Sequence, residues 1–152
     1  MESQKERLFH DPVYVSTIKQ GVLPKKTPLW KLRVPLKIKI FLWYLIKGAT
    51  LTKDNLAKRI WQGDIRCCFY SAVETIQYLF FDCHFARFVW NAVHTTFGIQ
   101  PPTSFSNMFG SWLNGIGPRL RNQILFGAAA LCWALWSNRN DVVFNKLKSI
   151  YI

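Results

Sequence analysis

An apolar run near the C-terminus, from Ile124 to Trp136, places the strongest limit on the fold. It is 13 residues long, whereas a helix that crosses a bilayer needs about 20. The run therefore predicts a buried helix, which we expect to extend from Arg119 to Lys146. The residues expected on its buried stripe are Leu125, Ala128, Ala129, Cys132 and Trp136. Half of the 152 residues are apolar, so the chain can bury this helix in the core of a single domain.

A second apolar pattern lies between Pro35 and Lys47. Its apolar positions recur at the i, i+3, i+4, i+7 spacing of a helix face and are Ile38, Phe41, Leu42 and Leu45. Pro35 suits a first helical turn, and Gly48 suits a helix end. A strand is the alternative, because apolar residues and lysines alternate over residues 36–40. The length of the segment favours the helix.

Capping signals predict two helices further along the chain. Thr52 can accept a backbone N–H bond at the start of a helix from Lys53 to Ile60. Ser71 and Glu74 have the spacing of a capping box, in which each side chain satisfies a free N–H of the first turn. This capping box predicts a helix over residues 72–81.

Two more segments complete the helical pattern. Residues 84–97 form a predicted helix that Gly98 ends. The residues expected on its buried face are Phe85, Phe88, Val89, Ala92 and Thr96. The loop over residues 99–118 holds a short helix near 107–113. The sequence thus predicts a mainly α domain over residues 30–146, with a loosely ordered lead-in over 1–29 and a tail over 147–152.

The charge balance is strongly basic, with 20 Lys and Arg against 8 Asp and Glu and a formal net charge of +12. Such an excess favours polyanionic partners such as nucleic acid. The candidate nucleic-acid-binding residues are Lys37, Lys39, Lys47, Lys53, Lys58 and Arg59. Trp30 or Trp43 is available to stack on a base. The alternative is that the lysines form only the solvated sides of helices and that the tryptophans belong to the core.

The most specific motif is the segment Cys-Cys-Phe-Tyr-Ser-Ala-Val-Glu-Thr-Ile-Gln-Tyr-Leu-Phe-Phe-Asp-Cys over residues 67–83. It resembles the zinc-binding domain at the C-terminal end of plant LINE-type (non-LTR) retrotransposon reverse transcriptases. That family's pattern is Cys-x2-Cys-x7-His-x4-Cys, with Glu-Thr before the histidine and Leu-Phe-Phe after it. Cys67 and Cys83 match the outer ligands, and Glu74-Thr75 lies in register. Flanking landmarks extend the resemblance over residues 29–145.

Two of the four ligand positions depart from this pattern. Tyr70 stands where the family has its second cysteine, and Tyr78 stands where it has histidine. Zinc prefers thiolate and imidazole, whereas a phenol, with a reference pKa of about 10, stays protonated near neutrality. The resemblance therefore implies a small helical domain around a degenerate zinc-knuckle-like segment, in which Cys67 and Cys83 are remnant ligands. We expect no cofactor and consider the ancestral zinc site lost.

No catalytic pattern accompanies the motif. Polymerase chemistry needs clustered carboxylates that hold two metal ions, and the sequence contains no Asp-Asp pair. We expect neither an enzyme nor a small-molecule substrate, no membrane association, and an intracellular location, nuclear or cytoplasmic. The expected function is that of a non-catalytic, retrotransposon-derived domain with weak, non-specific nucleic-acid binding. The alternative is a structural or protein-interaction domain, or a non-functional pseudogene product.

Overall fold

The computed structural model describes residues 28–145, so the predicted tail and all of the predicted lead-in except residues 28 and 29 lie outside it. The elements in chain order are η1 (Pro28–Lys31), α3 (Leu36–Ile46), α4 (Lys53–Ala57), η2 (Tyr78–Asp82), α5 (His84–Phe97), α6 (Phe105–Phe109), α7 (Pro118–Asn140) and η3 (Asp141–Asn145). This part of the chain contains no named strand, only an isolated antiparallel bridge between Arg66 and Val73. The predicted mainly α fold is confirmed.

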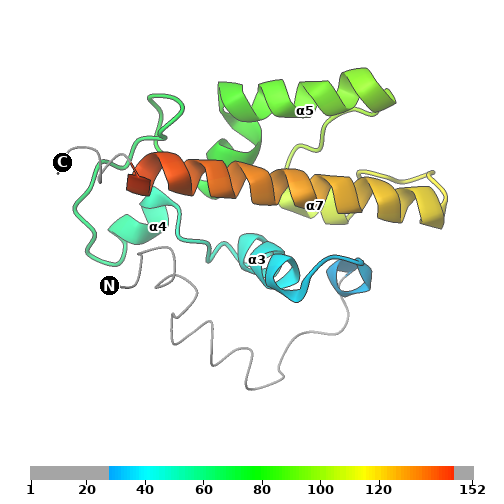
Figure 1. Cartoon of the computed structure of the whole chain (residues 1–152), viewed down its shortest axis with the longest axis horizontal. Coiled ribbons are helices and arrows are strands. Elements are labelled where there is room, and N and C mark those ends of the chain that lie inside the picture. Colours follow the sequence, from blue (N-terminus) through cyan, green and yellow to red (C-terminus); the bar gives the residue numbers. More distant parts are fainter. Residues whose placement is uncertain (1–27, 146–152) are drawn as a thin grey trace.

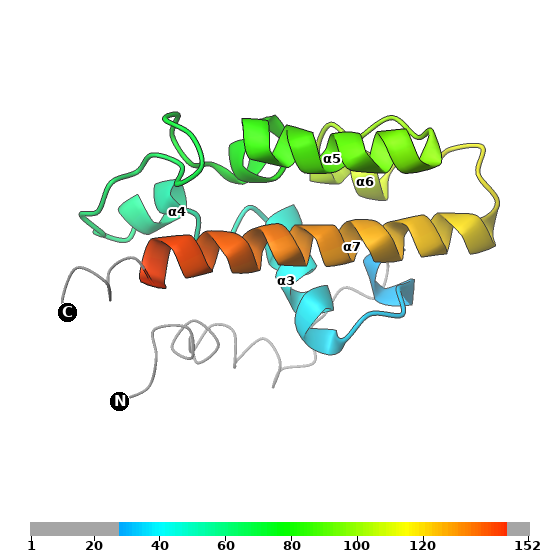
Figure 2. The same cartoon turned by 45° about the horizontal axis from the view of Figure 1, so that its top comes forward.

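The long helix α7 is the axis of the domain. Helix α5 runs along one side of it and α3 crosses the opposite side, as Figures 1 and 2 show from two directions. The buried residues of α7 are Leu125, Ala128, Ala129, Cys132, Leu135 and Arg139. The predicted stripe is therefore confirmed except for Trp136, which is half-buried. None of the helices within residues 28–145 has the length and apolar content that a membrane crossing requires.

Helix α3 confirms the helical interpretation of residues 35–47. Pro35 lies at the N-cap, and Gly48, with a φ of 68°, follows the helix in a left-handed conformation that glycine adopts without strain. The buried residues of α3 are Ile40, Phe41, Leu42 and Leu45. Phe41 packs edge-on against Trp133 of α7, with ring centroids 5.2 Å apart, and also contacts Phe80 of η2 at 6.1 Å. This aromatic cluster joins α3, η2 and α7.

Helix α5 has its predicted bounds, but the prediction of its buried face was wrong. The structure buries Ala86 and Trp90, whereas Phe85, Phe88, Ala92 and Thr96 are exposed. The Trp90 indole N–H donates to the Phe80 carbonyl oxygen at 2.7 Å, and its ring stacks on Phe81 at 5.9 Å. A buried indole needs both a large apolar surface and a hydrogen-bond acceptor, and only this orientation supplies both.

The two short helices differ from their predicted bounds. Helix α4 ends at Ala57 instead of residue 60, because Ile60 adopts a left-handed conformation with a φ of 67°. Thr52 lies at its N-cap position but makes no capping bond, since its hydroxyl donates to the Thr50 carbonyl and to the Asp54 carboxylate. Helix α6 begins at Phe105, two residues before the predicted start. Its N-cap is Ser104, whose hydroxyl accepts from the Asn107 backbone N–H at 3.1 Å.

Candidate metal centre

The motif over residues 67–83 begins in a tight turn, and the helix predicted from residue 72 begins later than predicted. The Cys67 N–H donates to the Ala72 carbonyl at 2.7 Å, and the Glu74 N–H donates to the Ile65 carbonyl at 2.9 Å. These two bonds flank the bridge between Arg66 and Val73, so residues 67–72 fold back on themselves. Helical geometry starts only at residue 76, preceded by the Thr75 hydroxyl, which accepts from the Tyr78 N–H at 3.1 Å. The predicted capping box of Ser71 and Glu74 was therefore wrong.

The four ligand positions converge on one region although they come from three places in the chain. Cys67 lies in the turn, Tyr78 begins η2, and Cys83 is the N-cap of α5, where its sulfur accepts from the Ala86 N–H at 3.3 Å. Cys67 and Cys83 are buried, Tyr78 is half-buried and Tyr70 is exposed. The structure thus places Cys67, Cys83 and Tyr70 near Tyr78.

The thiols in this neighbourhood contact one another. The interaction of Cys67 with Cys68 and Cys83 lowers the pKa of Cys67 and raises the pKa of the other two thiols, while the Cys83 thiol lies 3.8 Å from the Leu79 carbonyl oxygen, to which it donates. Desolvation raises the pKa of Tyr78, and the nearby thiols of Cys67 and Cys83 and the phenol of Tyr70 raise it further. The Tyr78 phenol is therefore an even poorer source of phenolate than a free tyrosine.

The residues present do not fit zinc. Structural zinc takes four thiolate, imidazole or carboxylate donors in a tetrahedron. Between residues 28 and 145 the structure contains no group of three or more Cys, His, Asp and Glu side chains that could hold a metal ion. His84, next to a remnant ligand, is exposed, and its ring packs on Tyr70 with centroids 4.3 Å apart. Within the described residues, Cys67 and Cys83 are therefore not joined by the further thiolate, imidazole or carboxylate donors that a structural zinc site needs.

Directly behind the motif lies a fully buried ion pair that the sequence did not reveal. Arg139 of α7 binds the Glu74 carboxylate through Nη2 at 2.5 Å and through Nε at 3.1 and 3.2 Å. Both side chains are fully buried. The same carboxylate accepts from the Lys53 backbone N–H at 2.9 Å, so Glu74 caps α4 from 21 residues away. The pair links the motif, α4 and the end of α7.

Arg139 has further partners at this junction. Its Nη1 donates to the Asn140 side-chain oxygen at 2.8 Å, and its Nη2 also lies 3.4 Å from the Leu51 carbonyl oxygen. The guanidinium lies 4.8 Å from the centre of the Trp136 ring. A lone arginine in an apolar helix is a sequence signal for such a buried partner. Its glutamate could not be identified, because the two residues are 65 positions apart.

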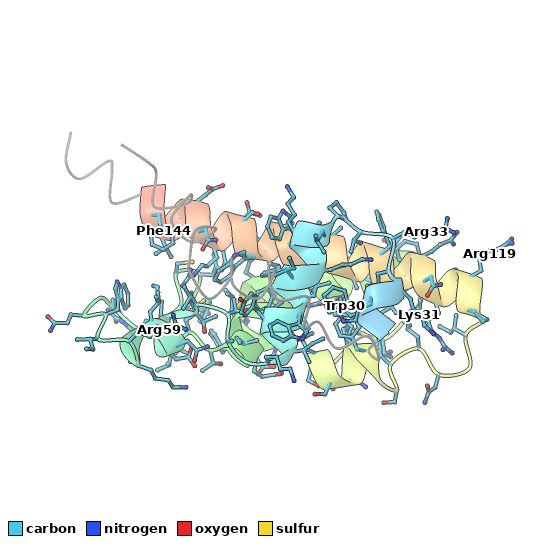
Figure 3. The ribbon with its side chains drawn as sticks, turned by 90° about the horizontal axis from the view of Figure 1, so that it is seen from below. Trp30, Lys31, Arg33, Arg59, Arg119 and Phe144 are labelled. Atoms are coloured by element: carbon cyan, nitrogen blue, oxygen red, sulfur yellow. The ribbon has the colours of Figure 1, made fainter. Side chains whose placement is uncertain are left out.

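The six predicted nucleic-acid-binding residues do not form one surface. Lys53 is buried and its Nζ donates to the Arg66 carbonyl at 2.6 Å. Lys39 is half-buried and donates to the Trp30 carbonyl at 3.0 Å. The other four are exposed but lie apart, with Lys37 at the start of α3, Lys47 after its end, and Lys58 and Arg59 beyond α4. Figure 3 shows Arg59 near one end of the domain, well apart from Trp30.

Comparison with known proteins agrees with this arrangement. Residues 12–90 match the protein-family model described as zinc-binding in reverse transcriptase. The matched range includes the whole motif with its two tyrosines and the first half of α5 up to Trp90. No curated protein and no solved structure matched the chain.

Proposed function

This chain belongs to the family of zinc-binding domains found in reverse transcriptases, and on that premise we propose that it binds nucleic acid weakly and without sequence preference. It acts as a non-catalytic accessory domain that derives from a plant LINE-type retrotransposon. Its contacts are to phosphates, through lysine and arginine side chains. It does so without a metal ion, because tyrosines stand at two of the four ligand positions and zinc prefers thiolate and imidazole.

The observation that carries this proposal is the charge of the folded part of the chain. Residues 28–145 contain 13 Lys and Arg against five Asp and Glu. Two of those five carboxylates are already bound by arginine, Asp64 by Arg66 and Glu74 by Arg139. The remaining positive field attracts a polyanion, and each neutralised phosphate releases a counterion. Binding of this kind has affinity without sequence recognition.

The positions of the carboxylates support the proposed non-catalytic role. Two-metal polymerase chemistry needs carboxylates that share metal ions about 3.5–4 Å apart. In the described residues, Glu74 is consumed by its ion pair, and the other acids belong to α4, the loop after it, η2 and η3. The domain therefore supplies binding and not chemistry.

The proposal is tested by a salt titration of the full chain with a labelled single-stranded oligonucleotide, followed by fluorescence anisotropy. We expect the logarithm of the association constant to fall linearly with the logarithm of salt concentration. We also expect equal affinity for sequences of different composition. An affinity that stays constant over the titration, or that depends strongly on sequence, would contradict phosphate binding.

A second candidate function is protein interaction, which the outer face of α5 favours. Phe88 is 73% exposed, and it lies on the opposite side of the helix from the buried residues Ala86 and Trp90. Phe88 also lines a shallow groove with Arg87, Asn91, His94 and Pro101. Replacing Phe88 with serine discriminates between the two functions, because it leaves phosphate binding unchanged and abolishes binding of a protein partner to this face.

A further inference from the structure

We propose that the nucleic-acid backbone binds along one edge of the domain, formed by Lys31, Arg33, Lys37 and Arg119, which we call the basic edge. This inference rests on the proposed function and adds the location of the binding surface. It differs from the set of lysines that the sequence indicated, sharing only Lys37 with it. The basic edge combines η1, the start of α3 and the start of α7.

The segment after η1 presents its cations outward by simple alternation. Leu32 and Val34 are buried, at 2% and 9% exposure. Lys31, which precedes Leu32, and Arg33, which lies between the two buried residues, are exposed. The Lys39 Nζ donates to the Trp30 carbonyl at 3.0 Å and so fixes η1 against α3. The two cations are therefore held on a rigid backbone, which lowers the entropy lost when they bind a ligand.

The first turn of α7 contains arginines, which add to the partial positive charge that the helix dipole places at a helix N-terminus. Its N-cap is Gly117, which has no side chain to accept a backbone N–H, and the first turn contains no acidic residue. It contains Arg119, which is exposed, and Arg121, whose Nη2 donates to the Ile116 carbonyl at 3.1 Å. Cations at a helix N-terminus oppose the helix dipole. A phosphate would relieve that opposition and accept from the arginine.

Three of the four side chains lie at one end of the molecule, and the fourth, Lys37, lies further along α7. Figure 3 shows Lys31, Arg33 and Arg119 together at one end, and in Figures 1 and 2 η1 lies beside the N-terminal half of α7. Lys37 extends the row, because its Nζ lies 5.6 Å from the centre of the Trp133 ring, further along α7. At about 1.5 Å per residue, Trp133 is roughly 20 Å from Arg119 along the helix. A row of that length fits an extended polyanion better than a single phosphate.

Within residues 28–145, no carboxylate belongs to the elements that form this edge. All five acidic residues within 28–145 belong to α4, the loop after it, η2 or η3, and none belongs to η1, α3 or α7. Asp141, the nearest acid to α7 in sequence, follows its C-terminal end. The positive field along the basic edge is therefore not cancelled locally, and field lines converge there.

The experiment compares two variants that remove the same charge. The edge variant carries Lys31→Gln, Arg33→Gln and Arg119→Gln. The control variant carries Lys47→Gln, Lys58→Gln and Arg87→Gln, which are equally exposed and lie elsewhere. Anisotropy of a labelled oligodeoxythymidine of about 20 nucleotides gives the salt slope for each full-length protein. Thermal melting confirms that both variants remain folded, as expected for exposed side chains.

We expect the parent and the control variant to share a slope of about −3, from four contacts to a single strand at about 0.7 each. The edge variant should fall to a slope of about −0.7. A fourfold rise in salt then weakens the parent about 50-fold and the edge variant only about threefold. Equal slopes for both variants would overturn the basic edge but not the proposed function. Salt-independent binding by the parent would contradict the proposed function itself.

A competitor identifies the kind of polyanion. Polyglutamate at the same charge concentration should displace the oligonucleotide poorly, because a carboxylate chain lacks the fixed phosphate spacing and the condensed counterions whose release drives phosphate binding. Displacement as complete as that by unlabelled oligonucleotide would mean that the basic edge is suited to acidic protein segments, and would overturn the proposal.

Discussion

Replacement of Arg139 with methionine tests how the motif is held in the fold. The substitution keeps an unbranched apolar stem of similar shape but removes the guanidinium. Glu74 would then be left fully buried with one donor instead of two, namely the Lys53 N–H. The Leu51 carbonyl and the Asn140 side chain would also lose their partner. Removing one member of a buried ion pair destabilises a protein by about 3–5 kcal/mol.

The magnitude is large relative to the whole fold, since a domain is stable by roughly 5–15 kcal/mol. For a chain of this length, roughly 2–4 °C of melting temperature accompanies each kcal/mol. We therefore expect the melting temperature of the variant to fall by about 6–20 °C. Urea unfolding followed by far-UV circular dichroism measures the same change as a lower midpoint at unchanged slope.

A double variant supplies the control. Replacing Glu74 and Arg139 together by methionine removes both buried charges, so it should be more stable than the Arg139 variant alone, with a coupling energy of about 2–3 kcal/mol. Strictly additive single substitutions would refute this account of the pair. So would an Arg139→Met variant destabilised by less than about 1 kcal/mol.

Three further outcomes follow from the structure. The double variant Tyr70→Cys, Tyr78→His should bind metal. We expect thiolate charge-transfer absorption with cobalt and a higher melting temperature with zinc. The parent should purify without stoichiometric zinc. Trp90→Phe should destabilise by about 1–3 kcal/mol because the Phe80 carbonyl loses its donor, whereas Phe88→Ser should change stability by at most about 0.5 kcal/mol in urea unfolding. The Arg66 guanidinium lowers the pKa of Asp64 from 3.8 to about 2. The Asp64 contribution to stability should therefore be complete above pH 3.8 and be lost as the pH falls toward 2, which NMR titration of its carboxyl would show.

The sequence predicted the elements whose signals are local. Periodicity with proline and glycine at the ends located α3 and α5, and the apolar run located α7. Such signals succeed because helix periodicity and capping depend on residues within a few positions of one another. That Cys67 and Cys83 are remnant metal ligands stays a prediction.

The errors share a different cause, which is tertiary competition. The Ser71 and Glu74 spacing is that of a capping box, but Glu74 gains more from the buried guanidinium of Arg139 and caps α4 instead. On α5, the buried face is the one that contains Trp90, whose indole N–H has a hydrogen-bond acceptor, and not the one that contains Phe85 and Phe88. Lys53 was predicted to bind nucleic acid at the surface, but its Nζ donates to the Arg66 carbonyl oxygen. Each of these choices depends on residues distant in sequence.

The most direct test of a metal-independent phosphate-binding domain is the affinity of the full chain for a single-stranded oligonucleotide, measured with and without a zinc chelator at two salt concentrations. The account predicts that the chelator changes nothing, and that raising salt from about 50 to about 200 mM weakens binding about 50-fold. Loss of binding in the chelator would show that zinc is still required. Binding unaffected by salt would contradict phosphate contacts as its basis.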